Sequence, residues 1–265
     1  MCDPTDAIPA ASTTPGLSRR GLLRYGAGAL FGAGLVAASG LALATPASAY
    51  SWSRTLQQGM TGSDVKELQI RVAGWAADSA SNTYVALDGD FGPGTYDAVR
   101  RFQSAYGLSA DGIVGPQTQS VLNSLESSDG STAHFDWSEF YSHDGSGFSG
   151  GKVDATTVKE NVRRLMYKLE AVRKKEGNNS VTINSGFRSV AYNTSIYGYP
   201  TNSMHQYGIA ADIVVSGVST KTLYQIGERS GFSGLESYSH SWQHMDSRVE
   251  YPYGAQSWWW EDGTV

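Results

Sequence analysis

Three short segments in the first half of the chain carry apolar residues at helical spacing. Each follows a turn rich in glycine, aspartate or proline, residues that end one segment and begin the next. Either Ser63 or Asp64 can cap the first segment by accepting a hydrogen bond from a backbone N–H group. The pattern predicts a small three-helix unit around a single core. Its apolar positions are Val65, Leu68 and Val72 in the first segment, Ala98, Val99 and Phe102 in the second, and Val121, Leu122 and Leu125 in the third.

A repeated turn separates these segments. Residues 88–95 (DGDFGPGT) and 111–118 (DGIVGPQT) share the pattern D-G-x-x-G-P-x-T. Asp-Gly forms a tight turn, an apolar residue attaches the turn to the core, and Gly-Pro precedes the threonine that begins a helix. The two repeats therefore predict where the second and third helices begin.

The second half of the chain has a mixed pattern. Residues 156–175 place apolar side chains along one side of a long amphipathic helix. Residues 181–183, 210–215 and 241–245 have the composition of short strands. A helix followed by short strands, with loops rather than crossover helices between them, predicts an α+β domain with a small antiparallel sheet and flanking helices. An aromatic cluster opens this domain, at Phe135, Trp137, Phe140 and Tyr141.

The first 49 residues have the features of an export signal. The pair Arg19-Arg20 precedes an uncharged, weakly hydrophobic run at 25–43 and an Ala-Ser-Ala sequence that ends at Ala49. The paired arginines and the two leucines that follow resemble a twin-arginine signal. We expect cleavage after Ala49, no membrane contact afterwards, and a secreted, cell-wall-associated protein.

A second change in composition divides the mature chain. Residues 126–134 are polar and lack apolar periodicity, which predicts a linker. The predicted parts are therefore the signal at 1–49, an all-α domain at 50–125, the linker, and the α+β domain at 135–265.

Charge and cysteine content narrow the chemistry. The formal net charge of -5 provides no basic field for nucleic acid. The single cysteine, Cys2, lies in the predicted signal, so the mature chain has neither a disulfide nor a thiolate metal site. A transition-metal site must then be built from histidine and carboxylate side chains.

Two histidines and one aspartate form the pattern that carries chemistry. In residues 203–212 (SMHQYGIAAD), glycine and alanines let the chain turn tightly between His205 and Asp212. His244 lies in the apolar strand predicted at 241–245. Two imidazoles and one carboxylate supply three protein ligands to zinc and leave a fourth position for water, as in hydrolytic sites. The sequence predicts one bound Zn²⁺.

The helical half resembles a wall-binding family. Residues 55–125, with the doubled Asp-Gly…Gly-Pro turn and the run from Phe102 to Gly112, are similar to the peptidoglycan-binding domain of many bacterial wall hydrolases. The resemblance implies that peptidoglycan is the partner of this domain. A helical spacer is the alternative, and the pattern does not fix which side chains contact glycan.

Residues 135–248 resemble the zinc D-alanyl-D-alanine carboxypeptidase family. The similarity lies in S-x-H-x-x-G-x-A-x-D at 203–212, in W-x-H-x-D at 242–246 and in S-G-F-R-S at 185–189. It extends over nearly the whole predicted α+β domain.

This resemblance, carried over position by position, implies that His205, Asp212 and His244 are the zinc ligands. It also implies that Arg188 holds a substrate carboxylate, a role that suits a planar and permanently charged guanidinium. A structural salt bridge is the alternative for Arg188. Ser203 is implied at the substrate site, where its hydroxyl orients the loop or a ligand through a hydrogen bond.

The catalytic base is where the sequence departs from this family. Several branches carry an acid three residues before the last zinc ligand, but Ser241 occupies that position here, and its hydroxyl cannot act as a base at neutral pH. A base is still needed, because the attacking water loses a proton and the departing amine gains one. The candidates are His240, then Glu236, then Asp246, which is also suited to orienting His244.

The resemblance implies a secreted zinc metallopeptidase that hydrolyses peptide bonds in peptidoglycan stems. We expect a D-Ala-D-Ala carboxypeptidase. The alternatives are an endopeptidase of the same family and a non-catalytic wall-binding protein with a degenerate metal site, for which Ser241 is the main argument. We also expect a monomer without a nucleic-acid partner.

Overall fold

The computed structural model describes residues 50–196, 200–238 and 241–260, all within one compact unit that spans Thr45–Val265. The predicted export signal and His240 lie outside the described residues. Among the residues described, no helix is long and apolar enough to cross a membrane.

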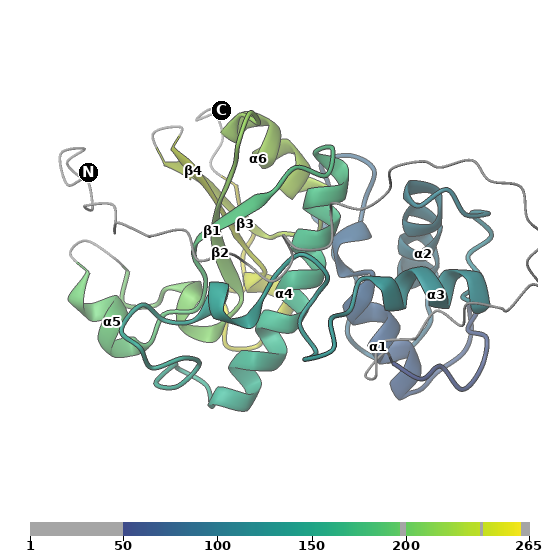
Figure 1. Ribbon diagram of the computed structural model, residues 1–265, viewed down its shortest axis with the longest axis horizontal. Helices are drawn as coiled ribbons and strands as arrows, with labels where there is room; N and C mark the ends of the chain where they lie inside the picture. The colour runs from purple at the N-terminus through teal and green to yellow at the C-terminus, as the bar shows by residue number, and fades with distance from the viewer. Residues whose placement is uncertain (1–49, 197–199, 239–240, 261–265) are drawn as a thin grey trace, which may run out of the picture. The chain divides into compact units, whose positions relative to one another are not determined.

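The described chain is helical first and mixed afterwards, and every helix and strand predicted from the sequence is present (Figure 1). The α-helices are α1 (Ser63–Arg71), α2 (Pro93–Ala105), α3 (Pro116–Ser124), α4 (Ala155–Lys175), α5 (Val190–Ser195) and α6 (Thr220–Glu228). The strands are β1 (Val181–Ser185), β2 (Ala210–Val215), β3 (Gly234–Tyr238), β4 (Trp242–Asp246) and β5 (Trp259–Trp260). Short 3-10 helices are η2 (Ala73–Trp75), η3 (Trp137–Phe140), η4 (Met204–Tyr207) and η5 (Arg248–Glu250).

Each Asp-Gly turn of the helical domain is held by a buried glutamine. Gln69 Oε1 accepts a hydrogen bond from the backbone N–H of Gly89 (2.8 Å), and its Nε2 donates to Asp88 Oδ1 (2.7 Å). Gly89 has a φ of 80°, which favours glycine. Gln103 repeats both hydrogen bonds at the second turn. A buried amide that satisfies the turn in this way fixes the start of the helix that follows.

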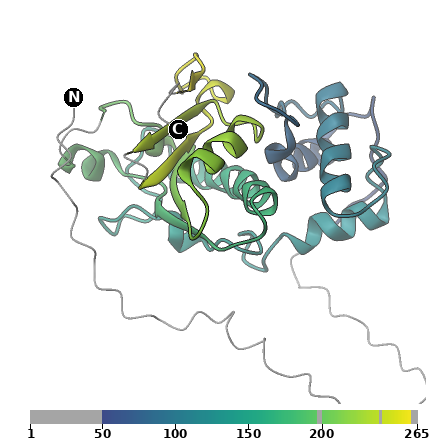
Figure 2. The same ribbon diagram turned by 90° about the horizontal axis from the view of Figure 1, so that it is seen from above.

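The second domain is built on a sheet with the strand order β1-β2-β4-β3-β5. Strands β1 to β4 pair antiparallel, whereas β5 pairs parallel with β3. One face of the sheet packs against α4 and α6 (Figure 1, and from above in Figure 2). Because strand residues alternate between the two faces, the opposite face carries the polar residues described below. The strand residues in the core are Val181, Ala211, Ile213, Val215, Leu235 and Met245.

The predicted fold class is confirmed, but the expectation of loops between the strands is wrong. Helix α5 lies between β1 and β2, and α6 lies between β2 and β3. Helix α6 begins after Ser219, whose hydroxyl accepts a hydrogen bond from the Thr222 N–H (3.1 Å), and it buries Leu223 and Ile226 in the core. Helices of six and nine residues give too few periodic positions to be distinguished from strands or loops.

Helix α4 belongs to the cores of both domains. Leu165 and Leu169 pack in the core beneath the sheet, whereas Tyr167 and Ala171 pack in the core of the helical domain. Gly74 in η2 approaches α4 so closely that an added Cβ would lie 2.4 Å from Ala171 Cβ. The two domains therefore meet along a packed seam.

A buried ionic cluster crosses this seam. Glu250 in η5 accepts hydrogen bonds from Arg164 Nη2 (2.8 Å) and from Lys168 Nζ. Arg164 also donates to the carbonyl oxygen of Val85 in the helical domain (2.6 Å), and Lys168 donates to Ser247 Oγ (2.7 Å). Burial lowers the pKa of Lys168 to about 8, although Glu250 opposes this shift. The cluster connects the helical domain to the residues that follow β4.

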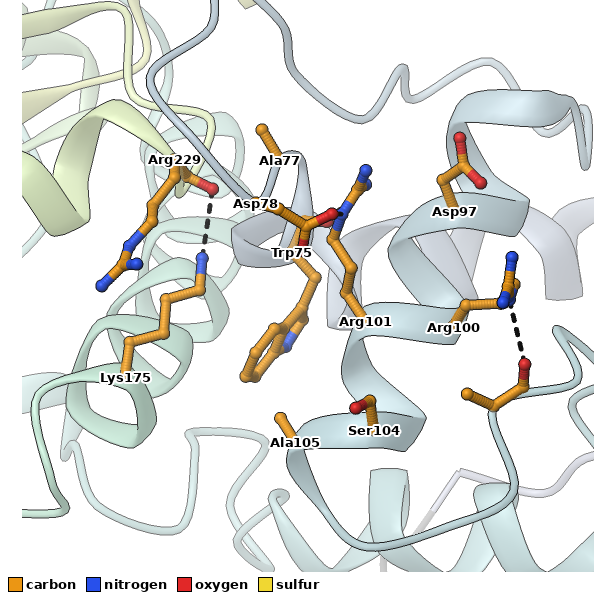
Figure 3. Close-up of a pocket in the computed structure, with 11 residues that line it drawn as sticks. Trp75, Ala77, Asp78, Asp97, Arg100, Arg101, Ser104, Ala105, Lys175 and Arg229 are labelled. Atoms are coloured by element: carbon orange, nitrogen blue, oxygen red, sulfur yellow. Dashed lines mark hydrogen bonds and ion pairs between the residues drawn. The ribbon is translucent and has the colours of Figure 1, made fainter.

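A cavity of about 530 Å³ lies along the seam, near the end of α4 (Figure 3). Lys175 Nζ donates to the carbonyl oxygens of Gly74 (2.8 Å) and Arg229 (3.1 Å). Arg101 Nε donates to Asp78 Oδ2 (2.8 Å). Because Lys175 joins the second domain to Gly74 of the helical domain, and Arg101 is paired within the helical domain, we interpret this cavity as part of the seam and not as a catalytic site.

Candidate metal centre

Polar residues form a row on the sheet face opposite α4. Asp212 in β2 is paired with His244 in β4, and His244 is paired with Glu236 in β3. Ser185 in β1 continues the row beside Asp212. Residues directly opposite one another in antiparallel strands point to the same face, so these side chains are neighbours.

Three of the predicted site residues converge at this row. His205, Asp212 and His244 each offer one ligand atom, and these atoms all lie within 4.8 Å of one another. His244 Nδ1 is 2.8 Å from Asp212 Oδ1 and 3.2 Å from His205 Nε2. His205 Nε2 is 3.3 Å from Asp212 Oδ1. All three residues are buried, and together they form a pocket of donor atoms that can hold one metal ion.

A second contact fixes the orientation of His205 and of Asp212. His205 Nδ1 lies 2.6 Å from the carbonyl oxygen of Gly186. A carbonyl oxygen only accepts hydrogen bonds, so Nδ1 carries the proton and Nε2 keeps its lone pair toward the cluster. Asp212 Oδ2 accepts a hydrogen bond from Arg188 Nη2 at 2.6 Å, which leaves Oδ1 facing the histidines.

Asp246 fixes the orientation of the His244 ring. Its Oδ2 lies 3.1 Å from His244 Nε2, on the side of the ring that faces away from the cluster. Arg248 Nη2 donates to that oxygen at 2.6 Å, and Asp246 is fully buried. The contact directs His244 Nδ1 toward the cluster, because metal-binding histidines are commonly oriented by a carboxylate on their other nitrogen.

The loop before β2 places His205. Ser203 begins η4 with a capping box, in which its hydroxyl accepts from the Gln206 N–H and its own N–H donates to Gln206 Oε1 (3.2 Å). Gly208 ends η4 with a φ of 72°, and an added Cβ there would lie 2.9 Å from the carbonyl oxygen of Val158. Only glycine suits this turn, which brings His205 back over the start of β2.

Comparisons with known proteins agree with this geometry. Residues 61–122 match the peptidoglycan binding domain family, and residues 133–246 match the family Peptidase M15. The zinc D-Ala-D-Ala carboxypeptidase of Streptomyces albus G is 43% identical over 220 residues, which cover 78% of this chain and 84% of that protein. The chain belongs to the Peptidase M15 family.

Two further matches to this M15 peptidase are shorter. The spore cortex-lytic enzyme of Bacillus cereus is 39% identical over 83 residues, which cover 31% of this chain and 30% of that enzyme. The crystal structure of the SleB N-terminal domain is 39% identical and covers 26% of this chain and 88% of that one, with a TM-score of 0.22. The resemblances predicted for the two halves of the sequence are confirmed.

The pKa values of the two cluster histidines of the M15 peptidase are shifted in opposite directions. Burial, reinforced by Arg188, lowers the pKa of His205. Burial also acts to lower the pKa of His244, but hydrogen bonds to Asp212 and Asp246 outweigh it and raise that pKa to about 9. Burial opposes ionisation of Asp212, yet the two histidines hold its pKa well below the ordinary value. These hydrogen bonds therefore favour the protonated form of His244 at neutral pH in the metal-free protein.

The donor set fits zinc. Zinc binds imidazole nitrogen and carboxylate oxygen in tetrahedral sites, and three protein ligands leave the fourth position for water or substrate. Each of the three side chains is also oriented by a contact outside the cluster, as expected for a metal site. The predicted zinc peptidase is confirmed by the family membership together with this cluster.

A cavity of about 330 Å³ opens onto the cluster. Arg188, Ser203 and Glu236 line it, so these predicted site residues lie beside the metal-binding atoms. Ser241 instead lines a separate cavity with residues of β2 and α6. His240 lies outside the described residues, so the structure gives no position for it.

Two cavity residues that were not predicted as site residues lie against each other. Arg248 and Trp259 both line it, and the guanidinium carbon of Arg248 lies 4.8 Å from the centre of the Trp259 ring. Trp259 reaches the cavity because β5 pairs with β3, a contact between distant parts of the sequence that no local pattern signals.

Proposed function

We propose that this M15 peptidase is a zinc-dependent D-Ala-D-Ala carboxypeptidase that acts on the peptide stems of peptidoglycan outside the cytoplasm. The observation that carries the proposal is the buried cluster of His205, Asp212 and His244 at the base of a cavity that Arg188 also lines. Similarity to a zinc D-Ala-D-Ala carboxypeptidase over 78% of the chain supports this choice of substrate.

His205, Asp212 and His244 are the zinc ligands in this proposal. When bound, zinc acts as a Lewis acid toward the scissile carbonyl and lowers the pKa of water. The carbonyl oxygen of Gly186 and the carboxylate of Asp246 keep the two imidazoles in the tautomer and orientation that a metal requires.

We assign the general base to Glu236. Its side chain lines the cavity, is partly exposed, and lies next to His244 on the sheet face that carries the cluster. From there the carboxylate can accept a proton from the attacking water and pass it to the departing amine. Asp246 is fully buried between His244 and Arg248, which supports an orienting role for it. His240 remains the alternative base.

Arg188 and Ser203 are the proposed substrate-binding residues. Arg188 Nε donates to Ser185 Oγ (2.8 Å) and its Nη2 donates to Asp212, which holds the guanidinium rigidly at the wall of the cavity. A fixed guanidinium beside the metal cluster suits the terminal carboxylate of a peptide. Ser203 lines the same cavity and caps η4, so we assign it both to contact with the substrate and to holding the loop that carries His205.

We propose that each predicted part of the chain has a separate function. Residues 1–49 direct export by the twin-arginine route, residues 50–125 bind peptidoglycan, residues 126–134 connect, and residues 135–265 hydrolyse. Binding to an insoluble polymer raises the local concentration of peptide stems around the cavity. We expect the mature protein to act as a secreted monomer at the cell wall.

Mass spectrometry of reaction products tests this function. The mature protein is incubated with a synthetic stem pentapeptide and with purified wall fragments, before and after chelation. We expect D-alanine to be released from the pentapeptide, release to stop on chelation, and zinc to restore it. Split stems or cross-links without D-alanine would identify an endopeptidase, and wall binding without any product would refute hydrolysis.

A ligand variant and a matched control separate hydrolysis from binding. We expect His205→Ala to lose zinc and turnover but still to sediment with wall fragments. His143→Ala removes a histidine that contacts Tyr192 and does not line the cavity, so it should retain all three properties.

A further inference from the structure

An arginine lies on each side of the metal cluster. Arg188 follows β1, at one edge of the sheet, and contacts Asp212. Arg248 stacks on Trp259 of β5, the strand at the opposite edge. Both arginines line the cavity, and the strands that carry the cluster lie between those two edges. A peptide lying across the cluster would therefore meet a guanidinium on either side of its scissile bond.

Arg248 is held in place by two contacts. Its Nη2 donates to Asp246 Oδ2 (2.6 Å), its Nε donates to Asp246 Oδ1 (3.0 Å), and its guanidinium carbon lies 4.8 Å from the Trp259 ring centre. Its side chain is 14% exposed. Within the described part of the chain, no group accepts a hydrogen bond from Arg248 Nη1. The guanidinium is therefore held in a fixed position at the cavity, and the N–H groups of Nη1 are available to a ligand.

We propose that Arg248, positioned by Asp246 and Trp259, is a specificity residue that binds a substrate carboxylate on the acyl side of the scissile bond. The inference rests on the proposed function, in which Arg188 holds the terminal carboxylate on the other side. The preferred substrates are then acidic peptides, in which the residue before the D-Ala-D-Ala pair carries a side-chain carboxylate.

The positive charge of Arg248 and its fixed position both favour this assignment. Hydrogen bonds between a guanidinium and a carboxylate are charge-assisted, and a guanidinium that is already ordered loses little entropy on binding. The acidic side chain that lines the cavity beside the ligands is Glu236, on the strand between β4 and β5. An anionic substrate group is attracted to Arg248 and repelled by Glu236, so the subsite selects for the position of the carboxylate as well as its charge.

Two N-acetylated peptides that differ by one carboxylate test the inference. We expect zinc-loaded wild-type protein to prefer N-acetyl-Glu-D-Ala-D-Ala over N-acetyl-Gln-D-Ala-D-Ala by about 10-fold in kcat/KM. Arg248→Gln should abolish this preference, and Arg248→Lys should retain part of it. Arg100→Gln, in the helical domain, is the matched control and should keep the full preference. If Arg248 only held Asp246, Arg248→Gln would slow both peptides equally and leave their ratio unchanged.

Binding of the cleaved products gives a readout that needs no turnover. By calorimetry, N-acetyl-Glu-D-Ala should bind wild-type protein more tightly than N-acetyl-Gln-D-Ala, and the difference should disappear in Arg248→Gln with its zinc content verified. Equal handling of the two peptides by the wild type, or an unchanged ratio in Arg248→Gln, would overturn the inference and leave the proposed function intact. If the wild type releases no D-alanine from either peptide, the proposed function fails, and product binding still decides the role of Arg248.

Discussion

His205, Asp212 and His244 each use one side-chain atom for the cluster and another for a partner elsewhere in the protein. These partners are Gly186 and Arg188 on one side and Asp246 on the other, so the ligand atoms are aimed before any metal arrives. Partners of this kind affect metal affinity without being ligands. Substitutions at the partners are therefore as informative as substitutions at the ligands.

The proton on His244 makes zinc binding pH-dependent. The pKa of His244 in the metal-free protein is raised from 6.5 to about 9, so between these values the folded protein holds a proton that zinc must displace. We expect the apparent zinc affinity to rise about tenfold per pH unit from pH 7 to 9 and to level off above that. Competition titrations with a chelator across this range measure it. A flat profile between pH 7 and 9 would mean that His244 is neutral in the metal-free site.

Glu236→Gln tests the general base. The amide keeps the size of the side chain but cannot accept the proton of the attacking water. We expect kcat on a stem pentapeptide to fall by about 10²–10⁴-fold, with the zinc content unchanged. Glu160→Gln, on the exposed side of α4, is the matched control. An unchanged rate in Glu236→Gln would move the role of base to His240.

At the scale of elements, strand β4 joins the metal site to the core. Met245 packs beneath the sheet while its neighbours His244 and Asp246 point to the opposite face. The absence of a side chain at Gly234 in β3 makes room for Asp246, since an added Cβ there would lie 2.2 Å from Asp246 Oδ2. The orientation of His244 thus depends on a glycine in the neighbouring strand.

Gly234→Ala should disturb the metal site from outside it. The new methyl group displaces the Asp246 carboxylate from His244 and Arg248, so we expect zinc affinity to fall by about 10–100-fold. Gly94→Ala in α2 adds the same methyl group where no other atom lies within 4 Å, so zinc affinity should be unchanged. Chelator competition on both variants measures the difference. Equal affinities would show that Asp246 does not control His244.

Sequence patterns predicted the three residues that converge in the cluster, and Asp246 beside them, because each lies within a short local motif. Contacts made by distant segments were not predicted. His205 and Asp212 are joined by a local turn whose glycine and alanines are visible in the chain. Asp246 lies two residues from His244 and was foreseen as its partner. Trp259 lines the cavity because β5 returns to β3, and the glutamines at the Asp-Gly turns act across about 20 residues in the first repeat. The positions of these residues depend on packing between segments that are far apart in the sequence, and local periodicity carries no information about that packing.

At the scale of the whole molecule, the helical domain is packed against the peptidase domain. Helix α4 contributes to both cores, and the segment between the domains buries Ser131 and Thr132. Arg164 and Glu250 extend this contact to the residues that follow β4. The packing therefore holds the helical domain at a fixed place relative to the cavity.

A shared helix predicts that the two domains unfold together. Gly74→Ala forces a methyl group against Ala171 and the backbone of Lys168, and we expect it to lower the free energy of unfolding by about 1–3 kcal/mol. Tryptophan fluorescence and zinc release, followed during the same thermal scan, should report one transition that shifts as a whole. Two separate transitions, of which only one shifts, would show that the domains fold independently.

In the proposed enzyme, two imidazoles and one carboxylate hold a single zinc ion at the base of the cavity. Anomalous diffraction at the zinc absorption edge, from crystals of the zinc-loaded mature protein, tests it most directly. We predict one strong peak, at about 2.0–2.2 Å from His205 Nε2, Asp212 Oδ1 and His244 Nδ1, with no fourth protein ligand. A peak elsewhere in the chain, or a site closed by a fourth side chain, would contradict this assignment of the zinc ligands.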